Sequence, residues 1–413
     1  MGGIREVGMA TSLPHHTLQQ HGCLRSYLTY FVNLTMKLSY ITITDPYDLR
    51  AFSGLNAHIL GALRGSGLSV QTIGNLKAET PLSFLKGAYY GRIKRQTFFK
   101  VHDTGVLRGF ASQVAQALKS SDCKLVFSPK WDPIAYLQTD KPIAFWHDAT
   151  IPSLVGFYPC YKNTCRKSIT NAIKAERLAL EKCCLAVYSS DWAANSAIEY
   201  YGVDPQKIRV VPFGANIVCN RTLKDILFSI EQRAHDCCHL LFIGGEWDRK
   251  GGDLAVQVAA SLNARGIPAE LHVVGCQPPG DLPDCVRVHG YISKETANGR
   301  HGLDALFTQS HFLILPTRAD CTPVVFPEAA SFGLPVLTTK VGGIPTVVHD
   351  GRNGHTFDVA ASARDYCDHI ERLWSNTAAY QALCQTSFNE YVTRLNWETA
   401  GQKVAALIQE HCG

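Results

Sequence analysis

The sequence lacks several features by which whole classes of protein are recognised. No window combines the length and the continuous apolar character of a membrane-spanning helix. No Gly-x-Gly-x-x-Gly opens either half of the chain, which speaks against a nicotinamide-binding Rossmann protein. The sequence therefore gives no sign of an integral membrane protein or of a typical dehydrogenase.

Concentrated positive charge is missing too. The 40 Lys and Arg residues exceed the 35 Asp and Glu residues only slightly, giving a net charge of +5, and sixteen His residues add to this. The basic residues are scattered rather than gathered into a stripe, so we do not expect a nucleic-acid-binding protein. The balance predicts a mild attraction to anions and an otherwise ordinary solvated surface.

The fifteen cysteines do not follow the spacing of metal ligands or of a disulfide framework. Cys183-Cys184 and Cys237-Cys238 are adjacent pairs, and many cysteines lie in apolar surroundings. The cluster 235–239 (HDCCH) resembles a metal site, but it lacks a second dyad at zinc-finger spacing. We therefore expect reduced, buried thiols, which favours a cytoplasmic location.

The first 36 residues differ from the rest of the chain in composition. They contain one acid, Glu6, among many small, polar and His residues. We interpret residues 1–36 as an N-terminal extension, possessing no packed core of its own, and an organelle transit peptide is the alternative. At 413 residues the remaining chain is long for one core and predicts two domains.

The stretch 316–354 carries the densest pattern in the chain. It follows an apolar run, 312–315, which has the length of a buried strand. Thr322 is a candidate N-cap ahead of Pro323, so a helix is expected to begin at about 323–326. Glu328 then lies close to the helix start, where free N–H groups and the positive end of the dipole attract a phosphate.

Two glycine-containing turns follow this helix. Residues 333–335 (GLP) end it, 336–338 return as a strand, and 341–345 (VGGIP) form a tight turn. Together with Asp320, these segments resemble the signature of the retaining family 4 glycosyltransferases, which have the GT-B fold. The matched residues are Asp320, Glu328-Ala329, Gly333-Leu334-Pro335-Val336 and Gly342-Gly343-Ile344-Pro345.

The chain departs from the family signature at two points. Its first acid is Asp320 where the family usually has Glu, and the family's Glu-Gly-Phe-Gly start is replaced by residues 320–323 (DCTP). Pro323 has no N–H, so one backbone donor that the family offers at this point is absent.

The resemblance implies an α/β protein with two Rossmann-like domains that face a central cleft. Residues 37–215 would form the N-terminal acceptor domain, and residues 216–395 the C-terminal nucleotide-sugar donor domain. Residues 396–413 would form a helix that packs back on the N-terminal domain.

Two segments of the N-terminal half have the pattern of strand ends that bind ligands. A strand at 39–44 leads through Ser53-Gly54 into a helix at 55–64, the geometry that seats a phosphate in doubly wound folds. The resemblance places Ser53 and Gly54 beneath the donor diphosphate. A second strand, 142–146, delivers His147 and Asp148; by resemblance His147 faces the donor sugar, with Asp148 orienting its ring.

The C-terminal half opens with a strand at 240–243, a glycine turn and a helix to about Leu262. Arg249 and Lys250 stand just before that helix, where cations suit phosphate oxygens. The family usually has an Arg five residues before the Lys, but Gly245 occupies that position, so we expect Arg249 to substitute for it.

Further positions are assigned to the nucleotide sugar by the resemblance. Glu328 would accept hydrogen bonds from the ribose hydroxyls, and Asp320 would hold hydroxyls of the donor sugar. The remaining donor-site positions are Gly214, Gly245, Gly275, Tyr291, Ile292, Thr322, Val324 and Val325, and backbone groups near Tyr291 and Ile292 would contact the nucleotide base.

Residues 77–103 read as an irregular basic segment with interleaved aromatics. Such a segment could line the acceptor site, and a surface excursion anchored by a few aromatics explains it equally well.

The resemblance implies transfer of a sugar from a UDP-hexose or GDP-mannose to a glycan, lipid or small-molecule acceptor, with retained anomeric configuration. The catalytic set would be His147, Asp148, Asp320, Lys250 and Arg249. No Asp-x-Asp occurs in the chain, so we expect neither a metal nor another cofactor. Peripheral membrane contact is left open, and the sequence does not indicate an oligomeric state.

Two alternatives remain. The first is a non-catalytic or regulatory module that binds a nucleotide sugar, which the departures at Asp320, Pro323 and Gly245 keep open. The second is a GT-B sugar-nucleotide epimerase or phosphorylase. Donor hydrolysis without an acceptor, or dependence on phosphate, would distinguish the second from a transferase.

Overall fold

The computed structural model describes residues 36–77 and 80–413. The extension predicted at 1–36 thus lies almost wholly outside the described residues. The described residues form one compact unit with two parallel sheets of six strands each. The N-terminal sheet has the order β2-β1-β3-β4-β5-β6, and the C-terminal sheet has the order β12-β11-β10-β7-β8-β9. This confirms the predicted α/β class.

The strands of the N-terminal sheet are β1 (Lys37–Ile41), β2 (Ser69–Ile73), β3 (Leu125–Ser128), β4 (Ile143–His147), β5 (Leu185–Tyr188) and β6 (Ile208–Val210). Those of the C-terminal sheet are β7 (Cys238–Ile243), β8 (Ala269–Val274), β9 (Val286–Gly290), β10 (Phe312–Leu315), β11 (Val336–Thr339) and β12 (Gly354–Phe357). Every neighbouring pair of strands is parallel.

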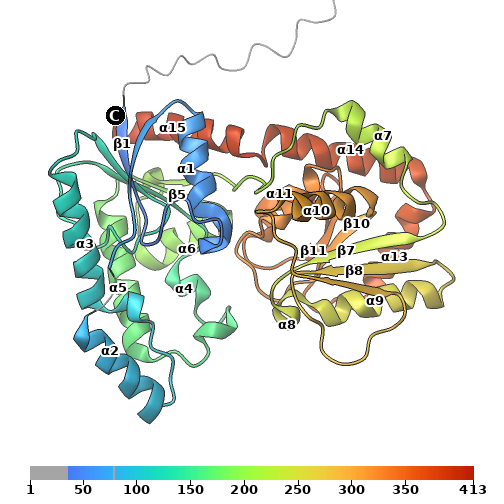
Figure 1. Ribbon diagram of the computed structural model, residues 1–413, viewed down its shortest axis with the longest axis horizontal. Coiled ribbons are helices and arrows are strands. Elements are labelled where there is room, and N and C mark those ends of the chain that lie inside the picture. Colours follow the sequence, from blue (N-terminus) through green and yellow to red (C-terminus); the bar gives the residue numbers. More distant parts are fainter. Residues whose placement is uncertain (1–35, 78–79) are drawn as a thin grey trace, which may run out of the picture. The chain divides into compact units, whose positions relative to one another are not determined.

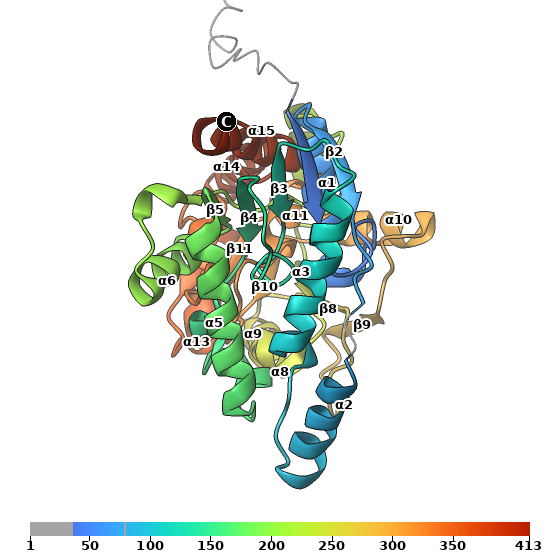
Figure 2. The ribbon, with the colours of Figure 1, turned by 90° about the vertical axis from the view of Figure 1, so that its left-hand side faces the viewer.

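Helices cover both faces of the N-terminal sheet (Figures 1 and 2). The helices of this half are α1 (Leu55–Gly65), α3 (Thr104–Leu118), α4 (Ile151–Leu154), α5 (Arg166–Lys182) and α6 (Asp191–Tyr201), together with α2 (Pro81–Ala88), which projects away from the sheet. Successive strand residues point to opposite faces. Phe145 accordingly packs into the cluster with α3, α5 and α6, whereas Trp146 packs into the cluster with α1 and the last helix.

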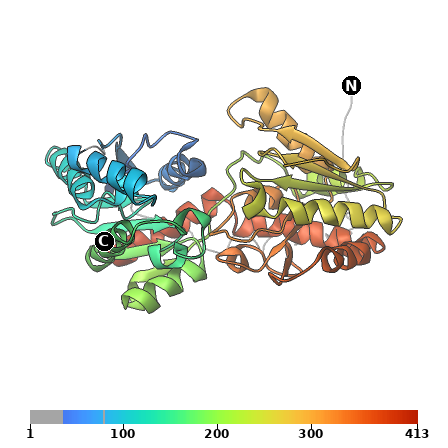
Figure 3. The same cartoon turned by 90° about the horizontal axis from the view of Figure 1, so that it is seen from below.

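The C-terminal sheet is likewise enclosed by helices, among which α9 runs alongside the strands (Figure 3). They are α7 (Leu223–Glu231), α8 (Trp247–Lys250), α9 (Gly252–Ala264), α10 (Ala297–Gln309), α11 (Val325–Ala330), α12 (Ile344–Val347), α13 (Ala363–Trp374) and α14 (Thr377–Thr393). The apolar strands β7, β8, β10 and β11 supply most of the sheet's share of this core, as expected for strands buried on both faces.

The last helix, α15 (Trp397–Cys412), packs on α1 and reaches β4 and β5 (Figure 1). Its buried residues, such as Val404 and Ile408, join the core of the N-terminal sheet. The helix predicted at 396–413 therefore crosses back to the N-terminal half, as expected.

The end of α15 also corrects the prediction that the cysteines are reduced thiols. Cys184, at the start of β5, forms a disulfide with Cys412, and their Cα atoms lie 5.8 Å apart. The two residues are separated by 228 positions, so only the return of α15 brings them together. The other twelve cysteines of the described residues are free thiols, as predicted.

The segment 77–103 is the main error in the predicted secondary structure. Instead of an irregular run it contains α2, followed by a single π-helical turn at Tyr89–Ile93. The sequence carries a local signal for this helix: Pro81 occupies its first turn, and Thr80 and Ser83 form a reciprocal capping box. The helix exposes apolar side chains, with Leu82 at 58%, Phe84 at 65% and Leu85 at 63%.

None of the helices in the described part of the chain has the length and apolar character needed to cross a membrane.

A carboxyl group is buried in the helical layer beside β5. Glu176, on α5, is fully buried, and its Oε2 accepts hydrogen bonds from the Ile151 N–H (2.7 Å) and the Tyr201 hydroxyl (2.5 Å). Its Oε1 has no partner among the described residues. Burial disfavours the charged form and raises the pKa of Glu176 to about 8.

We predict that Glu176 makes the protein less stable as pH rises. Its pKa is higher in the folded state than the reference value of 4.5, so the folded protein holds an extra proton between these values. Stability from this group is present at low pH and is lost towards pH 8, by at most about 1.4 kcal/mol per pH unit. In thermal unfolding from pH 5 to 8, the wild type should lose more stability with rising pH than Glu176→Gln, because the other titrating groups are common to both proteins. Parallel curves would contradict the assignment.

Candidate active site

The candidate site lies where the order of strands reverses in each sheet. In the C-terminal sheet the chain leaves β9 and returns as β10 on the other side of β7, so the loops after β7 and β10 diverge from adjacent strand ends. Open α/β sheets bind ligands at such switch points, beyond the carboxyl ends of the strands. Arg249 and Lys250 follow β7, and Asp320 follows β10.

A buried ion-pair cluster joins these two loops. The Nζ of Lys250 lies 2.6 Å from the Oδ2 of Asp320, and the Nη1 of Arg249 lies 3.4 Å from the same oxygen. The three side chains are between 8% and 12% exposed. The structure thus brings together the two cations predicted for the phosphates and the acid predicted for the sugar.

Backbone contacts fix the cluster in place. The Arg249 carbonyl accepts from the Arg318 N–H (2.7 Å) and from the Thr317 hydroxyl (3.1 Å), so α8 is tied to the loop after β10. Gly251 has φ of +76°, and a Cβ there would stand 2.0 Å from the Pro316 carbonyl oxygen. Only glycine suits this position, which explains the Lys-Gly pair in the sequence.

The turn at Gly342-Gly343 packs against the same loop. A Cβ on Gly342 would lie 2.0 Å from the carbonyl oxygen of Asp320, and one on Gly343 would lie 2.1 Å from that of Cys321. Gly342 also has a positive φ of 53°. The spacing of the signature therefore has a physical reason, because its glycine turn and its acid are in direct contact.

Glu328 forms a second buried ion pair, with Lys294. The carboxylate of Glu328 is 1% exposed and lies on α11, while Lys294 lies in the loop after β9. Tyr291 and Ile292, predicted to contact the nucleotide base, stand in this same loop. Tyr291 is 77% exposed. The acid predicted for the ribose and the loop predicted for the base are therefore neighbours.

The start of α11 differs from the prediction in two respects. Thr322 is not the N-cap: the helix begins at Val325 with Val324 as its cap, and the Thr322 hydroxyl instead lies 2.8 Å from the Ser189 hydroxyl. The N–H of Phe326 donates to the Pro323 carbonyl at 3.2 Å, so it is already used. No hydrogen bond found among the described residues uses the N–H of Val324 or Val325.

The predicted turn of the N-terminal half is a left-handed turn. Phe52, Ser53 and Gly54 all have positive φ, and the Ser53 carbonyl accepts from the Asn216 side chain at 2.8 Å. The Nζ of Lys130, which follows β3, lies 4.0 Å from the centre of the Phe52 ring. Since β1 and β3 flank the reversal in this sheet, these residues also mark a switch point.

His147 is the last residue of β4, and Asp148 follows it. Burial shifts the pKa of both side chains from its ordinary value. Burial, with a contribution from Lys130, lowers the pKa of His147 to about 3, so its ring is neutral. Burial raises the pKa of Asp148 to about 6. The His147 Nδ1 lies 3.3 Å from the Asp148 Oδ1, but without the geometry of a hydrogen bond. The ring of Phe52 lies 5.7 Å from that of His147.

The three glycines assigned to the donor site have different local surroundings. A Cβ on Gly214 would lie 2.3 Å from the backbone nitrogen of Trp397, so this glycine admits the start of α15. Gly275 has φ of +96° and packs against the carbonyl of Gly244. Gly245 stands in open space.

Residues of the two sheets meet at the loop after β10. The Cys321 N–H donates to the Tyr158 hydroxyl at 3.2 Å, and the guanidinium carbon of Arg249 lies 5.1 Å from the Tyr158 ring centre. Sequence reasoning missed Tyr158, Lys130 and Lys294. Lys294 follows the predicted base loop and could have been noticed; the other two carry no local signal.

Comparisons with known proteins agree with this geometry. Residues 237–376 match the family described as glycosyl transferases group 1. The D-inositol 3-phosphate glycosyltransferase of Nocardiopsis dassonvillei is 26% identical over 226 residues, which is 51% of this chain and 52% of that protein. The chain thus spans about half the length of the curated relatives it matches.

Solved structures show the same fold over most of the chain. Sucrose-phosphate synthase from Thermosynechococcus elongatus superimposes with a TM-score of 0.66 at 16% identity, covering 91% of this chain and 98% of that one. Anabaena HepE, solved with UDP and glucose, gives a TM-score of 0.60 at 14% identity, covering 91% and 99%. The chain has the GT-B fold, and its residues 237–376 are similar to the glycosyl transferases group 1.

Proposed function

We propose that this protein is a retaining, family 4 type glycosyltransferase that moves a sugar from a nucleotide sugar to an acceptor without a metal. The observation that carries the proposal is the convergence of Arg249, Lys250 and Asp320 at the switch point of the C-terminal sheet. Their spacing in the sequence and their contact in space agree with one binding site.

The cations would act on the leaving group. As the glycosidic bond breaks, negative charge grows on the nucleoside diphosphate, and preorganised positive groups stabilise that charge. Lys250 and Arg249 are already held together by the carboxylate of Asp320. A bound diphosphate would take over part of this pairing and leave Asp320 free to accept hydrogen bonds from the sugar.

Glu328 would recognise the ribose. Its buried carboxylate forms an ion pair with Lys294, and such pairing offsets the cost of burying a charge. Two hydroxyls of a ribose could replace or share the Lys294 contact. Because Lys294 belongs to the loop of Tyr291, binding of the base and of the ribose would be coupled.

The N-terminal half would present the acceptor side. The neutral ring of His147 can exchange hydrogen bonds with the donor sugar without adding charge. No carboxylate is assigned as a nucleophile, so we favour front-side attack, in which the leaving phosphate helps to remove the acceptor proton. This route retains the configuration at the anomeric carbon.

The identity of the donor is proposed from the similar structures. Anabaena HepE was solved with UDP and glucose and with UDP-glucose, so a UDP-hexose is our first choice, with GDP-mannose second. The proposed acceptor is a glycan, a lipid or a small molecule. A regulatory nucleotide-sugar-binding module is the alternative, and binding of a donor without transfer to any acceptor would favour it.

We predict that Lys250→Ala slows transfer about ten- to hundredfold, because one charge-assisted contact contributes about 1.5–3 kcal/mol. Steady-state kcat and KM with UDP-glucose and an acceptor found by screening would measure this. Lys403→Ala, an exposed substitution on α15, is the matched control and should behave as the wild type. An undiminished rate in Lys250→Ala would refute the role of Lys250.

We predict that turnover survives exhaustive treatment with EDTA. The diphosphate charge is met by Lys250 and Arg249, so no divalent cation is required at this position. The measurement is the initial rate after chelation and desalting, with and without added Mn²⁺. If activity is lost after chelation and Mn²⁺ restores it, the metal-independent mechanism is contradicted.

The exposed face of α2 supports peripheral membrane contact. Leu82, Phe84 and Leu85 are each more than half exposed, and the turn that follows adds Ile93 at 69%. Arg92, Lys94 and Arg95 are exposed beside them. An apolar surface bordered by cations suits an anionic lipid surface.

We therefore predict binding to anionic vesicles. The protein should cosediment with vesicles containing phosphatidylserine, less so with neutral ones and at high salt. Phe84→Asp should reduce this binding at least about fivefold, because it places a charge in the apolar contact. Phe228→Asp, at a residue of similar exposure on α7, is the control. Equal binding of the two variants would rule out α2 as the contact.

A further inference from the structure

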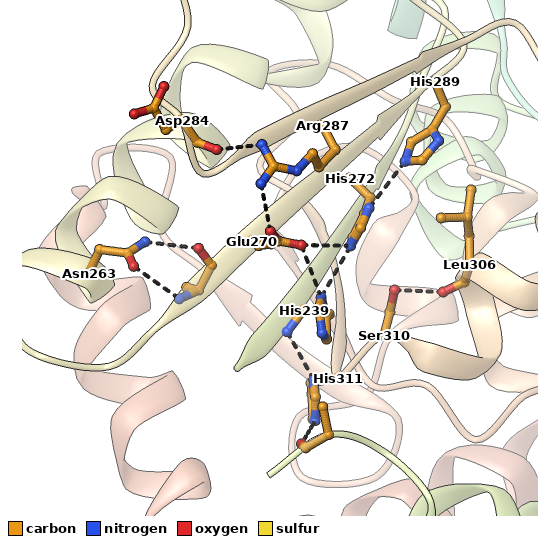
Figure 4. Close-up of polar contacts among 12 residues, drawn as sticks. His239, Asn263, Glu270, His272, Asp284, Arg287, His289, Leu306, Ser310 and His311 are labelled. Carbon is orange, nitrogen blue, oxygen red and sulfur yellow. Dashed lines mark hydrogen bonds and ion pairs between the residues drawn. The ribbon is translucent and has the colours of Figure 1, made fainter. Parts of the chain in front are cut away.

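Three side chains that could bind a metal converge near the amino ends of two strands in the C-terminal sheet (Figure 4). His239 lies on β7, and Glu270 and His272 lie on β8. In the parallel register His239 is paired with Glu270, and Leu241 with His272, so the three side chains emerge on one face. Lys250 and its cluster follow the opposite, carboxyl end of β7.

The distances within this group match a single metal ion. The His239 Nδ1 lies 3.2 Å from the His272 Nε2, and both lie near the Glu270 Oε2, at 3.8 Å and 3.9 Å respectively. The point in the plane of the three atoms that is equidistant from them is about 2.1 Å from each, close to the length of Zn–N and Zn–O bonds. An ion in tetrahedral geometry stands above this plane, so the three side chains would draw slightly closer together around it.

Outer contacts hold two of these side chains in a ligating orientation. The Nδ1 of His272 lies 3.1 Å from the Nε2 of His289, which leaves its Nε2 for the metal. Arg287 donates to the Oε1 of Glu270 at 2.9 Å, which leaves Oε2 for the metal. Such outer partners fix the tautomer and direction of metal ligands.

We propose that His239, Glu270 and His272 form a binding site for a divalent transition metal, Zn²⁺ in particular. Two imidazoles and one carboxylate are a ligand set that zinc accepts in tetrahedral geometry, with water in the fourth position. The side chains of His239 and Glu270 are 19% and 30% exposed, so an ion has access from solvent. This explains the metal-like sequence 235–239, whose missing partners come from β8.

The site is separate from glycosyl transfer. It lies at the other end of the strands from Arg249 and Lys250 and would join β7 to β8. Bound Zn²⁺ would therefore stabilise the folded C-terminal sheet by mass action, without taking part in the reaction.

The competing explanation is a chain of hydrogen-bonded imidazoles that binds no ion. The contacts His239–His272 and His272–His289, at 3.2 Å and 3.1 Å, would serve in such a chain without Glu270. Only a metal site requires His239 and the Glu270 carboxylate together.

The test is a Zn²⁺ titration of the 413-residue chain against a chromophoric competitor, after stripping with a chelator and without a thiol reductant, so that the Cys184–Cys412 disulfide is kept. The proteins are the wild type, His239→Gln, Glu270→Gln and the control His301→Gln, at an exposed histidine of α10. The free cysteines are common to all four proteins, so their contribution cancels. Circular dichroism checks that each variant is folded.

We expect the wild type and His301→Gln to bind one more Zn²⁺ than the other two variants, with a submicromolar Kd. Replacing either ligand should weaken this site at least about a hundredfold, since even outer partners affect affinity ten- to hundredfold. Zn²⁺ should also raise Tm in the wild type and His301→Gln but not in the ligand variants. Equal stoichiometry and affinity in all four proteins would overturn the proposal and leave the imidazole chain.

Discussion

The carboxylate of Asp320 is the interaction on which the candidate site depends. It lies within 2.6 Å of Lys250 and 3.4 Å of Arg249, and all three side chains are nearly buried. Buried charges of one sign are tolerated only when opposite charges meet them, so the loops after β7 and β10 specify each other's positions. The Gly342-Gly343 turn then closes on the backbone of the same acid. A ligand with a diphosphate and hydroxyl groups is the natural replacement for these internal pairings.

Much of this arrangement could be predicted from the sequence because its determinants are local. Apolar runs of four to six residues bounded by glycine and proline indicated the strands, and β10 (Phe312–Leu315) was predicted to the residue. The spacing from Asp320 to Glu328 and to the glycine turn identified the switch-point loops. Arg249 was inferred to replace the missing cation at Gly245, and its contact with Asp320 is consistent with that inference.

What the sequence did not reveal depends on tertiary neighbours. Thr322 is a residue type that is favoured at N-caps. In the structure its hydroxyl instead pairs with the hydroxyl of Ser189, which belongs to the other half of the chain. Tyr158 reaches Arg249 from 91 positions away, and no pattern in its own segment marks it. The helix α2 was missed for a different reason: its apolar residues have helical spacing, but they lie in a short segment with many basic and aromatic residues, and in the structure their side chains are exposed.

The return of α15 has a consequence for biosynthesis. Val404, Ile408 and their neighbours complete a core whose other members, such as Leu60 and Trp146, leave the ribosome more than 250 residues earlier. During translation, the N-terminal Rossmann unit therefore has one apolar face exposed to solvent until α15 has been synthesised. A truncation before residue 412 would remove Cys412, and one before Val404 would remove the cover itself, so quality control should act on the amino-terminal half of such a truncated chain.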